Sequence, residues 1–199
     1  MKASATLVAA MAALVCAGPL PAHHSISMIE ISTPIWVTGR VIRYEPVNPH
    51  VMIVLEERKT DGRIQRWNIE GPTLQRLARM RVADPFLKAG DVIEVCGFAF
   101  KKGGLIQSMF PDADGSSLPL VHGHMLSLPD GTRRLWGPYG KLDNCFRPGD
   151  QTSTWLEFLK ADPLARDGWC SGRAFVRIAS VAPKEFVDEI DKNMANPCH

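Results

Sequence analysis

Residues 40–57 read RVIRYEPVNPHVMIVLEE, and this stretch decides the fold. Two runs rich in β-branched and apolar residues flank a corner at Asn48-Pro49-His50, and such runs are typical of strands. A proline restricts the residue before it to extended geometry, so the corner is stiff. The stretch therefore predicts two strands joined by a corner that places His50 at one end of a β-layer.

Strand and turn patterns continue on both sides of this corner. The sequence predicts a short helix that starts at Pro72, and strands at 35–44, 50–57, 63–70, 92–100 and 105–109. The order of strand, strand, strand, helix, strand, strand is that of a small five-stranded OB-like barrel. The predicted fold class is mainly β: this barrel with its one short helix, plus a C-terminal α+β elaboration.

The N-terminal segment has the pattern of a secretory signal. Lys2 precedes an apolar run at 7–17 that is too short to span a bilayer well, and Ala22 suits the residue before the cleavage site. The predicted organisation is a signal peptide at 1–22, a barrel domain at 23–110, a linker at 111–119, and a C-terminal hairpin, loops and helices at 120–199 that pack on the barrel. We expect a periplasmic or secreted protein with no stable membrane anchor after cleavage.

Charge and cysteine content narrow the expectations further. The chain of 199 residues has a formal net charge of +2, which gives no basic footprint, and on this ground we expect no nucleic-acid partner. Of the 5 cysteines, Cys16 lies in the signal segment, and the remainder in an exported chain predict up to two disulfides. The turn-rich C-terminal sequence favours a Cys145–Cys170 bond, with Cys96 as a buried thiol in a strand.

Histidines are the residues that best support a site. A mature N-terminal His23 offers its α-amine and its ring nitrogen to one ion, and His50 is the first candidate for a third nitrogen, with His24 as an alternative. Such nitrogen donors suit copper(II), and zinc is an alternative ion. His122 and His124 are two residues apart, so on a strand they share a face about 6.6–6.8 Å apart.

Each of these places also has an ordinary explanation. A histidine at a terminus is usually frayed, His50 can cap its corner by bonding backbone, and a strand can simply expose two histidines. The alternative function is a metal-free OB-type interaction module that binds a small molecule, glycan or protein partner. In it, Trp67, Glu70 and Trp136 would line the ligand-binding groove, while in a metal site Glu70 would orient an imidazole.

No catalytic signature stands out in the sequence. There is no recognisable Ser-His-Asp or Cys-His arrangement and no glycine-rich phosphate loop. A copper oxidant, in which the three-nitrogen site activates oxygen, ranks last among the hypotheses because the sequence shows no recognisable substrate surface. We therefore expect a binding protein rather than an enzyme, with a metal ion or a small molecule as its partner.

Several short motifs together resemble a family of secreted bacterial proteins of unknown function. The residues that carry the resemblance are Ala22-His23-His24-Ser25, Gly39 with Val41, Asn48-Pro49-His50, Trp67 with Glu70, and Leu87-Lys88-Ala89-Gly90-Asp91. The resemblance covers roughly the first half of the chain, from His23 to Gly104, a span about the size of one small domain. The resemblance implies an exported β-barrel and brings no established activity.

Overall fold

The structure, a computed structural model, describes residues 28–79, 85–101, 111–137, 145–172 and 178–199. Its elements are β1 (Ile35–Glu45), β2 (Met52–Arg58), β3 (Ile64–Glu70), α2 (Leu74–Arg79), β4 (Val92–Ala99), β5 (Leu120–Ser127), β6 (Arg133–Leu135), α3 (Thr152–Ala161), α4 (Pro163–Cys170) and α6 (Lys184–Met194). The predicted signal segment and the predicted strand at 105–109 lie outside the described residues.

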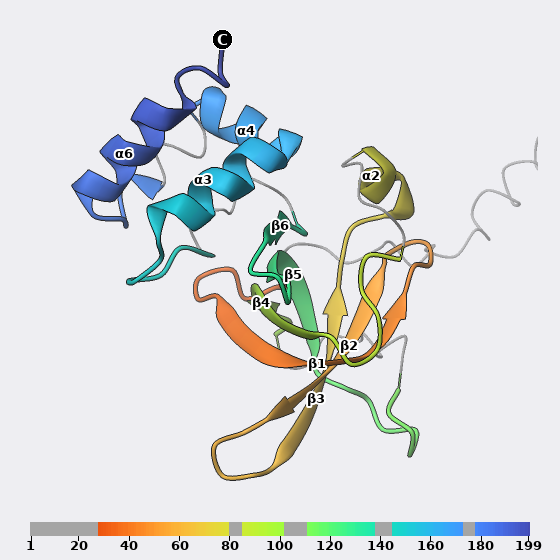
Figure 1. Ribbon diagram of the computed structural model, residues 1–199. Helices are drawn as coiled ribbons and strands as arrows, with labels where there is room; N and C mark the ends of the chain where they lie inside the picture. The colour runs from red at the N-terminus through yellow and green to blue at the C-terminus, as the bar shows by residue number, and fades with distance from the viewer. Residues whose placement is uncertain (1–27, 80–84, 102–110, 138–144, 173–177) are drawn as a thin grey trace, which may run out of the picture.

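The strands form a closed barrel, which confirms the predicted fold class. The sheet order is β3-β2-β1-β4-β5-β6, and a parallel pairing of β3 with β5 closes the first five strands into the barrel. The β2–β3 hairpin extends beyond the barrel at one end, and α2 lies at the other end (Figure 1). This is the architecture of an OB-like barrel.

The strand that closes the barrel differs from the predicted one. It is Leu120–Ser127, which the sequence analysis assigned to the C-terminal elaboration, so the barrel extends past the predicted boundary at residue 110. Pairing of Asn68 with Leu120 joins segments far apart in the chain, and no local pattern reports such a contact. The predicted hairpin itself is confirmed, since β5 pairs antiparallel with β6 around a turn at Gly131.

Apolar side chains form two cores on opposite sides of the same strands. One fills the barrel interior and includes Ile53, Ile69 and Val95. The other lies between the outer side of β4, β5 and β6 and the helices α3, α4 and α6, which Figure 1 shows grouped beside β6. The last of these helices, α6, faces this core with four buried residues, Phe186, Val187, Ile190 and Met194.

Two disulfides join parts of this second core, and their pairing corrects the prediction. The bonds are Cys96–Cys145 and Cys170–Cys198, so Cys145 does not pair with Cys170 and Cys96 is not a free thiol. Cys145 precedes a loop that lies against β4, which brings it to Cys96. Cys170 ends α4 and meets Cys198 beyond the end of α6. Among the described residues, none of the helices has the length and hydropathy to cross a bilayer.

Candidate functional site

Two histidine side chains from separate segments converge on Glu70, the last residue of β3. The Nε2 atom of His50 lies 3.6 Å from Glu70 Oε1, and the Nδ1 atom of His122 lies 3.4 Å from Glu70 Oε2. The Glu70 side chain is 4% exposed, whereas those of His50 and His122 are 25% and 22% exposed. One buried carboxylate therefore faces two imidazoles that reach the solvent.

The strand register explains this convergence. Glu70 pairs with Met52 on β2 and with His122 on β5, so the corner before β2 and the start of β5 flank the same residue. Ile69 and Val121 point into the barrel core. Because side chains alternate along a strand, Glu70 and His122 lie on the opposite, outer face.

Hydrogen bonding fixes the orientation of the His50 ring. Its Nδ1 atom lies 3.1 Å from the backbone carbonyl oxygen of Gly71, and a carbonyl only accepts, so Nδ1 carries a proton that it donates. In a neutral ring, Nε2 then presents a lone pair to Glu70. A cation placed between this lone pair and the carboxylate oxygen is attracted by both atoms.

His124 contributes to the cluster through packing. Its side chain is buried, and its ring centroid lies 5.1 Å from that of His122 and 4.8 Å from that of Phe98. The β4–β5 register shifts between Cys96 and Gly97, and the pairing there skips His124. The rings of His122 and His124 lie side by side next to Phe98, and the bulge in the β4–β5 register falls at His124.

The predicted N-terminal donors His23 and His24 lie outside the described residues. Within the part of the chain that is described, no three His, Cys, Asp or Glu side chains form a group arranged to hold a metal ion. His50, Glu70 and His122 are thus a convergent set and not a preformed metal centre.

The two predicted groove tryptophans take different positions. Trp67 lies on β3 opposite Leu55, donates its Nε1–H to Glu57 at 2.7 Å, and has the Lys59 ammonium 5.4 Å from its ring. It is thus engaged on β2 and β3 and lies outside the Glu70 cluster. Trp136 is 1% exposed and belongs to the barrel core, so it presents no stacking surface to solvent.

Sequence reasoning missed the backbone groups that complete the cluster. Gly71 supplies the carbonyl that orients His50, and Gly123, between the two histidines of β5, gives the Trp136 indole room beside the strand. The positions of these glycines in the sequence could have indicated their role, because Gly71 directly follows Glu70 and Gly123 lies between His122 and His124. Glycine in a strand often marks a close approach of another group.

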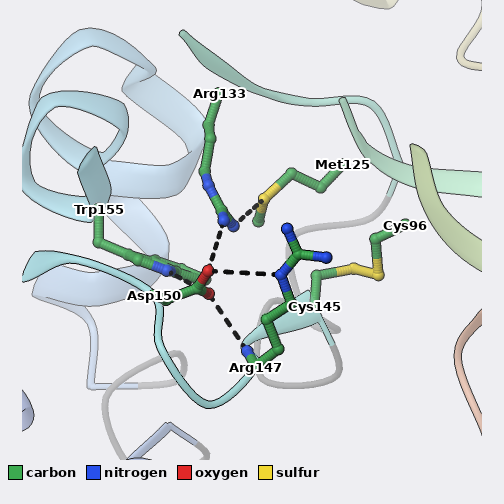
Figure 2. The surroundings of a disulfide bond; sticks show 7 residues. All are labelled: Cys96, Met125, Arg133, Cys145, Arg147, Asp150 and Trp155. Carbon is green, nitrogen blue, oxygen red and sulfur yellow. Dashed lines mark hydrogen bonds and ion pairs between the residues drawn. A yellow bond between two sulfur atoms is a disulfide. The ribbon is translucent and has the colours of Figure 1, made fainter. Parts of the chain in front are cut away.

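A second buried polar cluster joins the barrel to the helices. Figure 2 shows the Asp150 carboxylate beside the Cys96–Cys145 disulfide, where it accepts hydrogen bonds from Arg133 at 2.7 Å and from Trp155 Nε1 at 2.9 Å. Burial lowers the pKa of the Arg133 guanidinium, and the Asp150 charge opposes that shift. The polar groups of this cluster bind one another, and they connect the barrel to the helices. We call the cluster the structural joint.

The same joint reaches the first strand through one further arginine. The Arg147 guanidinium lies 4.6 Å from the Trp36 ring on β1 and pairs with Glu94 on β4 at 2.9 Å. Its backbone N–H donates to Asp150. Loop, barrel and helices are thus connected by contacts that sequence reasoning did not identify.

Comparison with known proteins finds similarity over part of the chain. No curated protein matches the chain. Two crystal structures of the mitochondrial single-stranded DNA binding protein Rim1 from S. cerevisiae, one labelled with SeMet, each match at 13% identity and a TM-score of 0.33, over 48% of this chain and 93% of theirs. At this identity the likeness concerns the fold alone.

The expectation of no nucleic-acid partner is corrected. The matched structures are by name single-stranded DNA binding proteins. Because barrels of this type include oligonucleotide binders, a net charge of +2 is no ground for excluding that class of partner. In sequence, residues 11–107 match the model of a family described as "Family of unknown function (DUF6152)", so the N-terminal part of this chain is similar to an uncharacterised family.

Proposed function

We propose that the chain is an exported binding protein that holds a transition-metal ion, copper(II) first, at Glu70 between His50 and His122. The observation that carries the proposal is the orientation of His50. Its Nδ1–H is directed to the Gly71 carbonyl, and its Nε2 faces a buried carboxylate oxygen 3.6 Å away. A cation between these two atoms is coordinated by both of them.

The separations of the donor atoms support this proposal. Two neighbouring donors bound at about 2.0–2.1 Å to one ion stand about 2.9 Å apart in the square-planar geometry of copper(II) and about 3.4 Å apart in the tetrahedral geometry of zinc. The two nitrogen–oxygen separations at Glu70 are 3.4 and 3.6 Å. An ion thus needs only small movements of the His50 and His122 rings, both of which are partly exposed.

The choice of copper follows from the donor types. Imidazole nitrogen suits copper, zinc, iron and nickel, and a given site binds copper(II) most tightly among the divalent ions of this series. We further propose that the His23 amine and ring supply additional nitrogens after cleavage behind Ala22. Zinc remains the alternative ion, because histidine and carboxylate serve both metals.

Export is part of the proposal. Two disulfides are typical of proteins that reach an oxidising compartment. Together with the signal-like N-terminal sequence, they support a periplasmic or secreted location. They also leave no free thiol among the described cysteines, so a soft sulfur site does not compete with the histidines for copper(II).

A metal-free interaction module has less support from the contacts. Of its three proposed groove residues, Trp67 is engaged by Glu57 and Lys59, and Trp136 is buried in the barrel. Only Glu70 lies where a ligand can reach it through its two histidine partners. This favours a cation over a stacked aromatic or sugar ligand.

The test is a copper(II) titration of the exported, naturally processed protein, with its N-terminus established by intact mass. We expect saturable binding of one ion, weakened at least tenfold by His50→Ala, because that change removes a donor held by Gly71. A copy with one extra N-terminal glycine is expected to bind more weakly as well, because the extension moves the amine away from the His23 ring. His199→Ala, at the exposed C-terminus, is the matched control and should bind like the wild type.

Equal binding by the wild type and His50→Ala would contradict the site at Glu70. Equal binding by the glycine-extended copy would remove only the contribution of His23. Absence of saturable copper or zinc binding in the wild type would overturn the proposed function.

A further inference from the structure

We propose that Trp136 is a positioning residue for the Glu70 cluster: its indole is a spacer that sets the separation between the end of β3 and the start of β5. The consequence for metal affinity rests on the proposed function above. The geometric part, that Trp136 sets the placement of His50 and His122, stands on contacts of the protein alone.

The indole occupies the space where two glycines lack side chains. A Cβ atom on Gly71 would lie 2.2 Å from Trp136 Cζ2, and one on Gly123 would lie 2.5 Å from Trp136 Cδ1. Both distances are far shorter than any real contact of a Cβ atom. The ring is thus in direct contact with the backbone of two different strand segments and leaves no slack between them.

Both glycine backbones are attached to the cluster. Gly71 follows Glu70 and holds the His50 ring through its carbonyl oxygen at 3.1 Å. Gly123 follows His122, which faces Glu70 from the other side. A shift of either glycine away from the indole therefore moves a donor group relative to the Glu70 carboxylate.

Trp136 is itself held by β5, by Phe86 and, through its neighbour Gly137, by α2. Its backbone N–H donates to the His124 carbonyl at 2.7 Å, the Phe86 ring centroid lies 5.6 Å from its own, and Arg76 donates to the Gly137 carbonyl at 2.7 Å. Its Nε1–H makes no hydrogen bond within the described part of the chain. The ring position is accordingly set by shape, and a smaller aromatic ring loses no hydrogen bond there.

The consequence for a metal site is large because coordination tolerates little displacement. Metal–ligand distances hold to within about 0.2 Å, and a site about 1 Å too loose fails. A change at Trp136 that moves β3 and β5 by a fraction of an ångström thus changes the metal affinity, while the barrel still folds.

The test uses a clash and its relief. Gly71→Ala places a methyl group against Cζ2, Cε2 and Nε1 of Trp136, and Trp136→Phe removes atoms from that side of the ring. The control is Gly39→Ala, whose Cβ would lie 2.7 Å from the Glu56 carbonyl oxygen on the β1–β2 pair, away from the cluster. The variants are Gly71→Ala, Trp136→Phe, the double variant and Gly39→Ala.

The readouts are the ring ¹⁵N resonances of His50 and His122 in the metal-free protein, the copper(II) affinity, and the melting temperature. We expect Gly71→Ala to shift both ring resonances and to weaken copper binding at least tenfold. The double variant should return the resonances toward the wild type and restore affinity to within about threefold, since the two changes share one contact. Gly39→Ala should lower the melting temperature without changing either of the other readouts.

Wild-type ring resonances in Gly71→Ala, or shifts no larger than in Gly39→Ala, would overturn the positioning role. If Gly71→Ala does not fold, Trp136→Phe decides: unshifted His50 and His122 rings would overturn the role, and shifted rings support it. If the wild type binds no metal but Gly71→Ala shifts the rings and the double variant restores them, the proposed function fails while the positioning role stands.

Discussion

Replacing Asp150 with alanine is expected to lower the free energy of unfolding by about 3–5 kcal/mol, the usual cost of removing one partner from a buried ion pair. The Asp150 and Arg133 side chains are 5% and 7% exposed and 2.7 Å apart. Without the carboxylate, the Arg133 charge stays buried with no opposite charge beside it. Trp155 Nε1 and the Arg147 backbone N–H also lose their acceptor (Figure 2).

Urea unfolding with the disulfides intact, followed by tryptophan fluorescence and circular dichroism, measures this loss. A double variant, Arg133→Met with Asp150→Ala, should recover part of the stability, because no uncompensated charge remains in the interior. Asp188→Ala is the control, since it removes only an exposed ion pair on α6 and should leave the midpoint unchanged. An Asp150→Ala midpoint equal to that of the wild type would show that the cluster does not hold the helices to the barrel.

The cluster around Asp150 and the Cys96–Cys145 bond could not be predicted from the sequence. Cys96 was predicted to be a thiol in an apolar strand, and Cys145 was paired within the C-terminal half. The true partner of Cys145 depends on a loop that crosses back to β4, fixed by Arg147 on Trp36 and Glu94. Arg147 and Glu94 are 53 positions apart, the bonded cysteines are 49 apart, and Trp36 lies still farther from Arg147, so local patterns do not report these contacts.

Much of the barrel was predictable because its elements have strong local signals. The Pro-rich corner, the turn near Gly62, and the switch from strand to helix at Gly71-Pro72 together give β1 to β3 and α2 in their correct order. The strand at Leu120–Ser127 was predicted as part of a hairpin, but its role in closing the barrel was missed because its pairing with β3 is parallel and follows a long connection. Parallel pairing of distant strands leaves only an apolar run in the sequence.

The residue types of the site were also predictable, but their grouping was not. His50, Glu70 and His122 each stood out as candidates, yet only the register Met52–Glu70 and Glu70–His122 places them together. The same register assigns Trp67 to a position opposite Leu55, away from Glu70. One face of a strand can be derived from alternation, whereas the neighbour across the sheet depends on the fold.

The second large effect is expected at Glu70. Glu70→Gln should weaken copper(II) binding about a hundredfold or more, equivalent to at least about 2.7 kcal/mol. The change keeps the volume of the side chain but removes the negative charge that both imidazoles face. It also replaces one carboxylate oxygen with an NH₂ group, which donates hydrogen bonds and has no lone pair to offer a metal. Because Glu70 faces both His50 and His122, its loss should weaken copper(II) binding more than the loss of either histidine alone.

Glu57→Gln is the matched control for that experiment, because Glu57 is also a barrel carboxylate with a close partner, Trp67 Nε1 at 2.7 Å. It should change copper affinity by no more than the error of the titration. If Glu70→Gln binds as tightly as Glu57→Gln, Glu70 is not a ligand, and any copper bound is held by the nitrogens of the N-terminus. The glycine-extended protein then separates the two outcomes: binding lost only on extension locates the ion at His23, whereas binding lost only with Glu70→Gln locates it between His50 and His122.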